Sequence, residues 1–483
     1  MKYTDFLPAL LLSGMLATMP VRGTEAVSAN LPSLGDATSG IISPQQEYEL
    51  GRRYLKVIRG QTPTESDAEL KDYLERLVSR LSAASELKDH RLTTLIIKDT
   101  RINAFAAPGG IIGVNTGLFL NANSEAQFAA VLAHELAHLS QRHYARNVEN
   151  AKNNSLPTAA AILGSIILIA AGGAEAGAAG ITSTMAGLMS SQLGFSRQLE
   201  READNLGMVT LVRAGFDPRA MSDVFEQMGK AHRFSSRPPE FLSTHPVTEN
   251  RISDSRARAD QMRAKGGTDS ESYQLMRMRA VVLSTDNPHA LLNELTKELA
   301  TRHSGNPDIT RYGIALLATQ TNQIKQAETA LEPLLKSNPD NLYYLIAKAN
   351  LDAAAGNTAV AIKNINKALE VYIDYYPLMV TKATLLTQQK NYKASRDIWL
   401  ALSDRRQDDP DIWYELAEAQ GQAGDILGLH QARAEYFFLT GNIDDAIKHI
   451  QYAQKMVKNN FALKTALDKK LKDMYDYRKN MSN

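Results

Sequence analysis

His134-Glu135-Leu136-Ala137-His138 sets the architecture of the first half of this chain. Each residue of an α-helix advances by about 100°, so side chains four residues apart point in nearly the same direction. The two histidines could therefore bind one zinc ion, with Glu135 beside them as a base acting on a water molecule. The surrounding segment 125–146 contains no Pro or Gly and is rich in helix formers, which predicts a single helix.

A third zinc ligand is expected from a second helix, because a catalytic zinc site has three protein ligands and one open position. Segment 197–207 (RQLEREADNLG) contains Glu200 and Asp204 four residues apart on one helix face. We assign Glu200 as the third ligand and Asp204 as a carboxylate that accepts the outer N–H of a ligand histidine. Glu202 points to the opposite side and is interpreted as a solvated charge. His143 lies half a turn from the motif and is given a capping or supporting role.

A further histidine lies in Ser243-Thr244-His245-Pro246. The following proline favours an extended loop at His245. This imidazole could donate a hydrogen bond to a reacting oxyanion or move onto the zinc ion, with Arg251 supporting it. An ordinary exposed loop histidine is the alternative.

Four short motifs resemble those of peptidase family M48, a family of zinc metalloproteases. In chain order they are NAFAAPGG (103–110), AHELAH (133–138), EREAD (200–204), and THP (244–246) with Arg251. The resemblance implies a zincin-like fold with one zinc ion per chain, bound by His134, His138 and Glu200. It further implies that Glu135 is the general base and that His245 gates or assists the site, with the arginine as its companion.

A small sheet is expected next to the zinc-binding helix. Segments 92–97 and 111–115 are rich in branched residues, and Pro108-Gly109-Gly110 is predicted to form a turn between them. If segment 111–115 is the edge strand beside that helix, an extended substrate could add to it through main-chain hydrogen bonds. An ordinary hairpin of the core is the alternative.

Composition restricts the class of protein and its location. The chain has 483 residues, enough for two or three domains, and its 54 basic and 53 acidic side chains suggest no nucleic-acid partner. Residues 1–29 hold an apolar run followed by small residues, which predicts a signal peptide and a periplasmic protein. A short membrane anchor is the alternative. There is no cysteine, so no disulfide can form. Residues 30–41 are predicted to be a flexible lead-in.

An uncharged stretch leaves the relation to membranes open. Residues 156–174 carry no charged side chain, yet Ala and Gly predominate, so insertion would be marginal. We predict that segment 156–195 is a mobile apolar hairpin that shields the active-site cleft or touches a membrane peripherally. A membrane-embedded protease that uses residues 156–174 is the alternative.

The second half is repetitive. Ala327, Ala361 and Ala394 recur in similar contexts at spacings of 34 and 33, which is typical of tetratricopeptide repeats. Such repeats stack into a superhelix whose concave face binds other proteins. The 52-residue step to Ala446 is interpreted as a degenerate repeat. A plain helical bundle is the alternative.

The predicted fold is α+β and mainly α, with a metalloprotease domain (42–265) that contains a small sheet, followed by an all-α repeat domain (270–483). The predicted function is that of a periplasmic zinc endopeptidase with an additional chaperone role. The M48 resemblance implies unfolded or stalled outer-membrane β-barrel proteins as substrates. It also implies docking of the repeats on the outer-membrane barrel assembly machinery. The alternative is a periplasmic chaperone or scaffold whose zinc site is permanently closed by His245.

Overall fold

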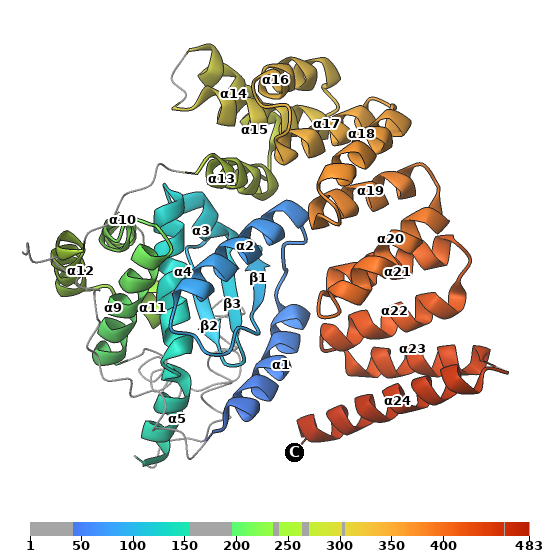
Figure 1. Cartoon of the computed structure of the whole chain (residues 1–483), viewed down its shortest axis with the longest axis horizontal. Helices are drawn as coiled ribbons and strands as arrows, with labels where there is room; N and C mark the ends of the chain where they lie inside the picture. The colour runs from blue at the N-terminus through green and yellow to red at the C-terminus, as the bar shows by residue number, and fades with distance from the viewer. Residues whose placement is uncertain are drawn as a thin grey trace, which may run out of the picture. The chain divides into compact units, whose positions relative to one another are not determined.

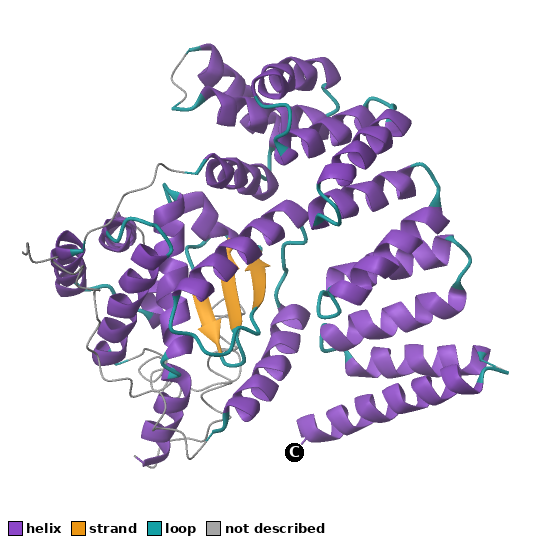
Figure 2. Ribbon diagram, viewed as in Figure 1, coloured by secondary structure: helices purple, strands orange, loops and turns teal. Residues whose placement is uncertain are grey.

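The computed structural model describes most of the chain: residues 42–153, 196–234, 241–262, 270–301, 305–457 and 459–482. The predicted signal peptide, the lead-in, the apolar segment 156–195 and the junction 263–269 between the two predicted domains lie outside these ranges. No helix in the described ranges has the length and apolar character needed to cross a bilayer. The fold is mainly helical with one small sheet, as predicted (Figures 1 and 2).

Two amphipathic helices open the described chain, as the apolar spacing predicts. Helix α1 (Pro44–Gln61) begins at a capping box in which Ser43 and Gln46 bond each other's backbone. Helix α2 (Ala68–Ala84) is capped by Asp67, which accepts a hydrogen bond from the Leu70 N–H. One face of α2 lies in the main core.

The sheet has three strands, and the sequence analysis identified only two of them. Strands β1 (Thr93–Ile97), β2 (Ala104–Ala107) and β3 (Ile111–Asn115) lie in the order β1-β3-β2. β3 is parallel to β1 and antiparallel to β2. Segment 111–115 is therefore the central strand, and its prediction as an edge strand is wrong. The turn at 108–110 joins β2 to β3, with Gly109 and Gly110 both at a φ of 77°.

The helix that carries both motif histidines runs through the predicted protease domain. Helix α4 (Glu125–Ser140) is buried over residues 128–138 and packs on β2 and on α9 (Arg197–Arg213). A Cβ at Gly207 of α9 would lie 3.2 Å from the backbone nitrogen of His134, so a side chain there would crowd the contact between α9 and α4. The other helices of this domain are α3 (Thr116–Asn121), α5 (His143–Asn153), α10 (Arg219–Phe234), α11 (Phe241–Thr244) and α12 (Glu249–Gln261).

The predicted helix over residues 125–146 is broken after Ser140. Arg142 has a φ of 49°, and a second helix, α5, begins at the next residue. The Arg142 guanidinium bonds the Glu47 carboxylate at 2.9 Å and the Ile42 carbonyl at 2.7 Å. These tertiary contacts hold a left-handed residue where the local sequence contains neither glycine nor proline.

The C-terminal half consists of stacked helical pairs. A left-handed residue joins the two helices of successive pairs at Asn322, Gly356, Lys390 and Gly424, 34 residues apart each time. The small residues Ala327 and Ala361 are fully buried where helices meet. The helices are α13 (Glu271–Ser284), α14 (Pro288–Ala300), α15 (Pro307–Gln320), α16 (Ile324–Ser337), α17 (Leu342–Ala354), α18 (Thr358–Val371), α19 (Tyr376–Gln388), α20 (Tyr392–Arg405), α21 (Pro410–Gln422), α22 (Ile426–Leu439), α23 (Ile443–Met456) and α24 (Phe461–Ser482).

The predicted degenerate repeat is wrong. The N-cap residues of α20 and α22, Asn391 and Asp425, are 34 positions apart, so the pair α21–α22 is regular. Ala446 lies on α23, which is the first helix of the next pair, whereas Ala394 lies on the second helix of its pair. The 52-residue step therefore compares different positions of the repeat.

The repeats contact the predicted protease domain through α2. The Lys71 ammonium group lies 2.7 Å from an Asp409 carboxylate oxygen and 2.9 Å from Asp411. Arg406 forms an ion pair with Glu75 of the same helix. Lys71 and Asp409 are both largely shielded from solvent, so this contact has the character of a buried salt bridge.

Candidate metal centre

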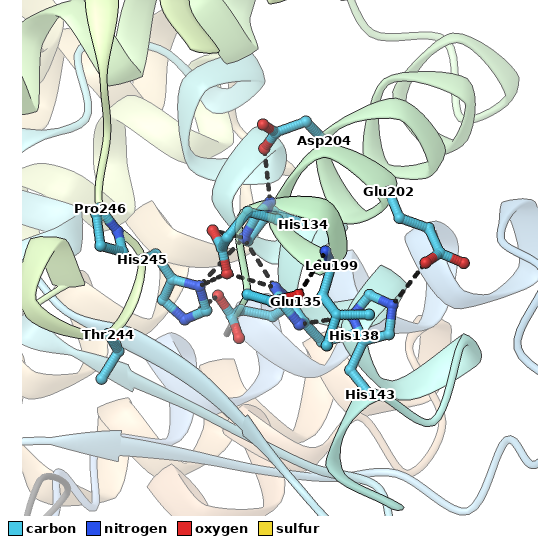
Figure 3. Close-up of polar contacts among 12 residues, drawn as sticks. His134, Glu135, His138, His143, Leu199, Glu202, Asp204, Thr244, His245 and Pro246 are labelled. Carbon is cyan, nitrogen blue, oxygen red and sulfur yellow. Dashed lines mark hydrogen bonds and ion pairs between the residues drawn. The ribbon is translucent and has the colours of Figure 1, made fainter. Parts of the chain in front are cut away.

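Four buried side chains, three from two helices and one from the residue that follows a third, converge on one point. His134 and His138 come from α4, Glu200 from α9, and His245 from the residue after α11. One potential ligand atom from each lies within 4.8 Å of all the others. Figure 3 shows the three imidazoles turned toward one another. Within the described ranges this is the one group of this kind.

The geometry of the cluster fits a zinc ion. The Nε2 atoms of His134 and His138 are 3.0 Å apart, and Glu200 oxygens lie 3.6 Å from the former and 3.5 Å from the latter. His245 Nδ1 is 3.3 Å from His134 Nε2 and 3.0 Å from Glu200 Oε1. Three ring nitrogens and a carboxylate that face one centre are the nitrogen and oxygen donors typical of zinc sites.

Asp204 and Arg251 lie directly behind the ligands. An Asp204 oxygen is 3.0 Å from His134 Nδ1, the ring nitrogen that faces away from the cluster. The Arg251 guanidinium donates two hydrogen bonds to the Asp204 carboxylate, at 2.8 and 2.7 Å. Its Nη1 atom also lies 2.8 Å from Glu200 Oε2. The structure thus brings both residues to the site, where they can hold one histidine ligand and the carboxylate ligand in position.

Glu135 is placed to act as a base. Its side chain is buried, and one oxygen lies 3.5 Å from His245 Nε2. Burial raises the pKa of Glu135 above its ordinary value, while His245 and His134 oppose that rise and the Ala106 backbone N–H donates a hydrogen bond to its carboxylate. Ala106 belongs to β2, so Glu135 lies at the outer strand of the sheet formed by the described residues.

At two of the four positions in the cluster, the surroundings favour the protonation state that binds a metal ion. Burial opposes ionisation of Glu200, but His245 and His134 outweigh it and hold the pKa of Glu200 well below its ordinary value. Burial, followed by the neighbouring His134, keeps the pKa of His138 well below the usual histidine value. Burial also acts against protonation of His134, yet hydrogen bonds to Asp204 and Glu200 raise its pKa to about 9. A metal ion that binds at neutral pH would therefore displace a proton from His134.

Two residues take part in the site more closely than the sequence analysis predicted. Glu202 is not a solvated charge, because it lies 3.4 Å from His143 Nε2 and 3.0 Å from Arg146 Nη1. His143 is fully buried, and its Nδ1 is 2.9 Å from Nδ1 of His138 (Figure 3). After the break at Arg142, His143 and Arg146 on α5 contact Glu202 on α9, and His143 contacts His138. Nothing in the local sequence indicated that break.

His245 is likewise buried, so the exposed-loop alternative is wrong. Its ring stacks on Phe241 with centroids 4.7 Å apart. The histidine before proline was found from the sequence, but its place beside Glu200 and Glu135 depends on tertiary packing.

Comparison with known proteins matches both halves of the chain. The model of peptidase family M48 matches residues 68–259. The β-barrel assembly-enhancing protease of Escherichia coli (strain K12) is 33% identical over 428 residues, which cover 89% of this chain and 88% of that protein. A putative β-barrel assembly-enhancing protease of Vibrio cholerae is 33% identical over 430 residues, with the same coverage of both chains. The mitochondrial metalloendopeptidase OMA1 of Schizosaccharomyces pombe is 33% identical over 180 residues, which cover 37% of this chain and 50% of that protein.

Proposed function

We propose that this chain, which belongs to peptidase family M48 and is a metalloendopeptidase, uses a zinc ion to cleave unfolded or stalled outer-membrane β-barrel proteins in the bacterial periplasm. The observation that carries this proposal is the buried His134–His138–Glu200 ligand set with Glu135 beside it. The names of the bacterial relatives support the substrate class, and the apolar run in residues 1–29 supports export.

In the proposed reaction His134, His138 and Glu200 hold the zinc ion. When bound, zinc supplies Lewis acidity and lowers the pKa of water toward neutrality. The Glu135 carboxylate takes a proton from the attacking water and then gives it to the leaving amine of the peptide. Its raised pKa suits this double role, because the group must both accept and release a proton near neutral pH.

We place the substrate at the free edge of β2 rather than at β3. The β2 strand pairs with β3 on one side only, and Ala106 on it contacts Glu135. An extended peptide that added to this edge would lie beside the base, and its affinity would come from backbone hydrogen bonds. Such binding requires an unfolded segment and selects weakly for sequence. The repeat domain (270–483) would deliver such clients to the protease domain (42–265), or dock the enzyme on the barrel assembly machinery.

His245 is proposed to keep the enzyme latent. In the structure its Nδ1 belongs to the ligand cluster, where it would fill the position that a catalytic zinc leaves open for water. A client that displaces this imidazole would open the site. Replacing His245 by Ala should then increase proteolysis and self-cleavage, whereas unchanged or lost activity would assign it another role.

The central test compares wild type with Glu135→Gln in digestion of casein and of an unfolded barrel protein, with zinc content measured in both. Equal zinc content and lost cleavage in the variant would support the assigned base. Persistent cleavage in a clean preparation would overturn that assignment.

A chaperone or scaffold is the second candidate function, favoured by the same position of His245 in the cluster. Four protein ligands are typical of structural zinc sites. This function predicts that wild type and His245→Ala both bind zinc and unfolded clients but cleave neither casein nor client.

A further inference from the structure

Each histidine of the zinc motif has one ring nitrogen that faces away from the ligand cluster. For His134 this is Nδ1, which lies 3.0 Å from the Asp204 carboxylate. For His138 it is also Nδ1, which lies 2.9 Å from Nδ1 of His143. The fold therefore places a carboxylate beside the outward nitrogen of the first histidine and an imidazole beside that of the second.

His143 in turn contacts a carboxylate. Its Nε2 atom is 3.4 Å from Glu202 Oε2, and the same oxygen accepts a hydrogen bond from Arg146 Nη1 at 3.0 Å. Glu202 and Arg146 are partly buried, with side-chain exposures of 16% and 14%. A continuous path of polar contacts thus runs from His138 through His143 to a carboxylate–arginine pair, parallel to the Asp204–Arg251 pair behind His134.

The donors along this path follow from the chemistry of imidazole. When Nε2 of His138 is a metal ligand and the ring is neutral, its Nδ1 carries the proton and must donate. His143 Nδ1 then accepts, so the proton of the neutral His143 ring is on Nε2, where it faces the acceptor Glu202. If His143 carried its proton on Nδ1 instead, two N–H groups would face each other at 2.9 Å.

We propose that His143 and Glu202 are positioning residues of the metal centre, which fix the tautomer and the ring orientation of His138. Neither residue belongs to the ligand cluster, and His143 contacts it only through the outward ring nitrogen of His138. Their effect on the reaction therefore passes through His138. Outer partners of this kind typically change metal affinity by roughly 10-fold to 100-fold. The kinetic part of this inference rests on the proposed peptidase function, but the metal-binding part does not.

The first measurement is the zinc dissociation constant, obtained by competition with a chromophoric chelator. Glu202→Gln should weaken zinc binding by at least several-fold, and His143→Leu by roughly 10-fold or more. His143→Asn keeps an acceptor oxygen near the place of Nδ1 but loses the link to Glu202, so it should fall between wild type and His143→Leu. Glu226→Gln is the matched control, because it removes a glutamate–arginine pair of 2.9 Å that lies outside the site.

The second measurement tests whether the two residues act in series. In the His143→Asn background, the further change Glu202→Gln should leave the zinc affinity unchanged, because the link between the residues is already lost. Fully additive effects would mean that Glu202 acts only by tying α9 to α5, which overturns the proposal. It is equally overturned if Glu202→Gln leaves zinc affinity within about twofold of the control Glu226→Gln.

The remaining readouts separate this proposal from the proposed function. Thermal unfolding of the zinc-free proteins should show Glu202→Gln folded like wild type, which keeps the result interpretable if His143→Leu fails to fold. With zinc saturating, kcat should fall while KM for a peptide substrate stays constant, because neither residue lies on β2, where we place the substrate. If wild type cleaves nothing but the zinc affinities follow the expected order, the peptidase proposal fails and the positioning role stands.

Discussion

Replacing Asp204 by Asn tests whether the buried pair behind His134 holds the metal centre together. The carboxylate accepts two hydrogen bonds from Arg251 and lies 3.0 Å from His134 Nδ1, and both members of the pair are about 5% exposed. Asparagine has nearly the same shape but lacks the charge. The variant therefore leaves a buried guanidinium beside a neutral amide.

The expected loss of stability follows from this burial. Breaking a buried ion pair by removing one partner costs about 3–5 kcal/mol, because the remaining charge is uncompensated. In the variant, Arg251 still has two other partners, the Glu200 carboxylate at 2.8 Å and the Pro246 carbonyl at 2.8 Å. We therefore expect the lower end of the range, about 3 kcal/mol, in the free energy of unfolding of the zinc-free protein. Zinc affinity should fall roughly 10-fold or more, because His134 loses its charged acceptor.

The structure offers a matched control in Asp260, which bonds Arg219 at 3.0 and 3.1 Å. That pair is more than half exposed on both sides, so Asp260→Asn should cost no more than about 1 kcal/mol. Guanidinium unfolding of the two variants and wild type provides the comparison. Equal losses for the buried and exposed pairs, or an unchanged zinc affinity in Asp204→Asn, would refute the role assigned to Asp204.

Three further outcomes are expected elsewhere in the chain. Lys71→Met should lower the free energy of unfolding by about 3 kcal/mol in a denaturant titration, because it leaves Asp409 buried without its closest cation. Gly207→Leu should reduce bound zinc, measured by metal analysis of the folded protein, since the added side chain would push α9 away from His134. Arg279 outweighs the effect of burial and holds the pKa of Asp67 below its ordinary value. The stability that this pair contributes should therefore be fully present above the unfolded pKa of about 3.9 and be lost as pH falls through the lower folded pKa. In Asp67→Asn, the free energy of unfolding should therefore decrease less steeply as the pH is lowered.

Features with short-range geometry could be predicted from the sequence alone. The spacing of four that places His134 over His138 also places Glu200 over Asp204, and it needs only the pitch of a helix. The 34-residue period of the repeats is local in the same sense, because each pair of helices contacts mainly its neighbours. The path of the chain between these elements could not be predicted in the same way.

Two errors had a tertiary origin, and a third did not. The second strand, Ala104–Ala107, has a composition with weak strand preference and is held in the sheet by its pairing with β3. The break at Arg142 depends on Glu47, 95 residues earlier in the chain. The repeat count failed for another reason, because alanine is buried on both helices of a pair and so Ala446 was matched to the wrong one.

The acidic residues of α9 show why one of these errors matters for the site. Glu200 enters the ligand cluster and Asp204 supports His134, as residues four apart on one face should. Glu202 points away from that face, and it reaches the centre through His143 of α5, which contacts His138. One turn of α9 thus supplies a candidate ligand, the outer partner of His134, and the carboxylate beside His143, which is the outer partner of His138. A displacement of this helix along α4 would therefore disturb all three contacts together, and a side chain at Gly207 would crowd the point where the two helices meet.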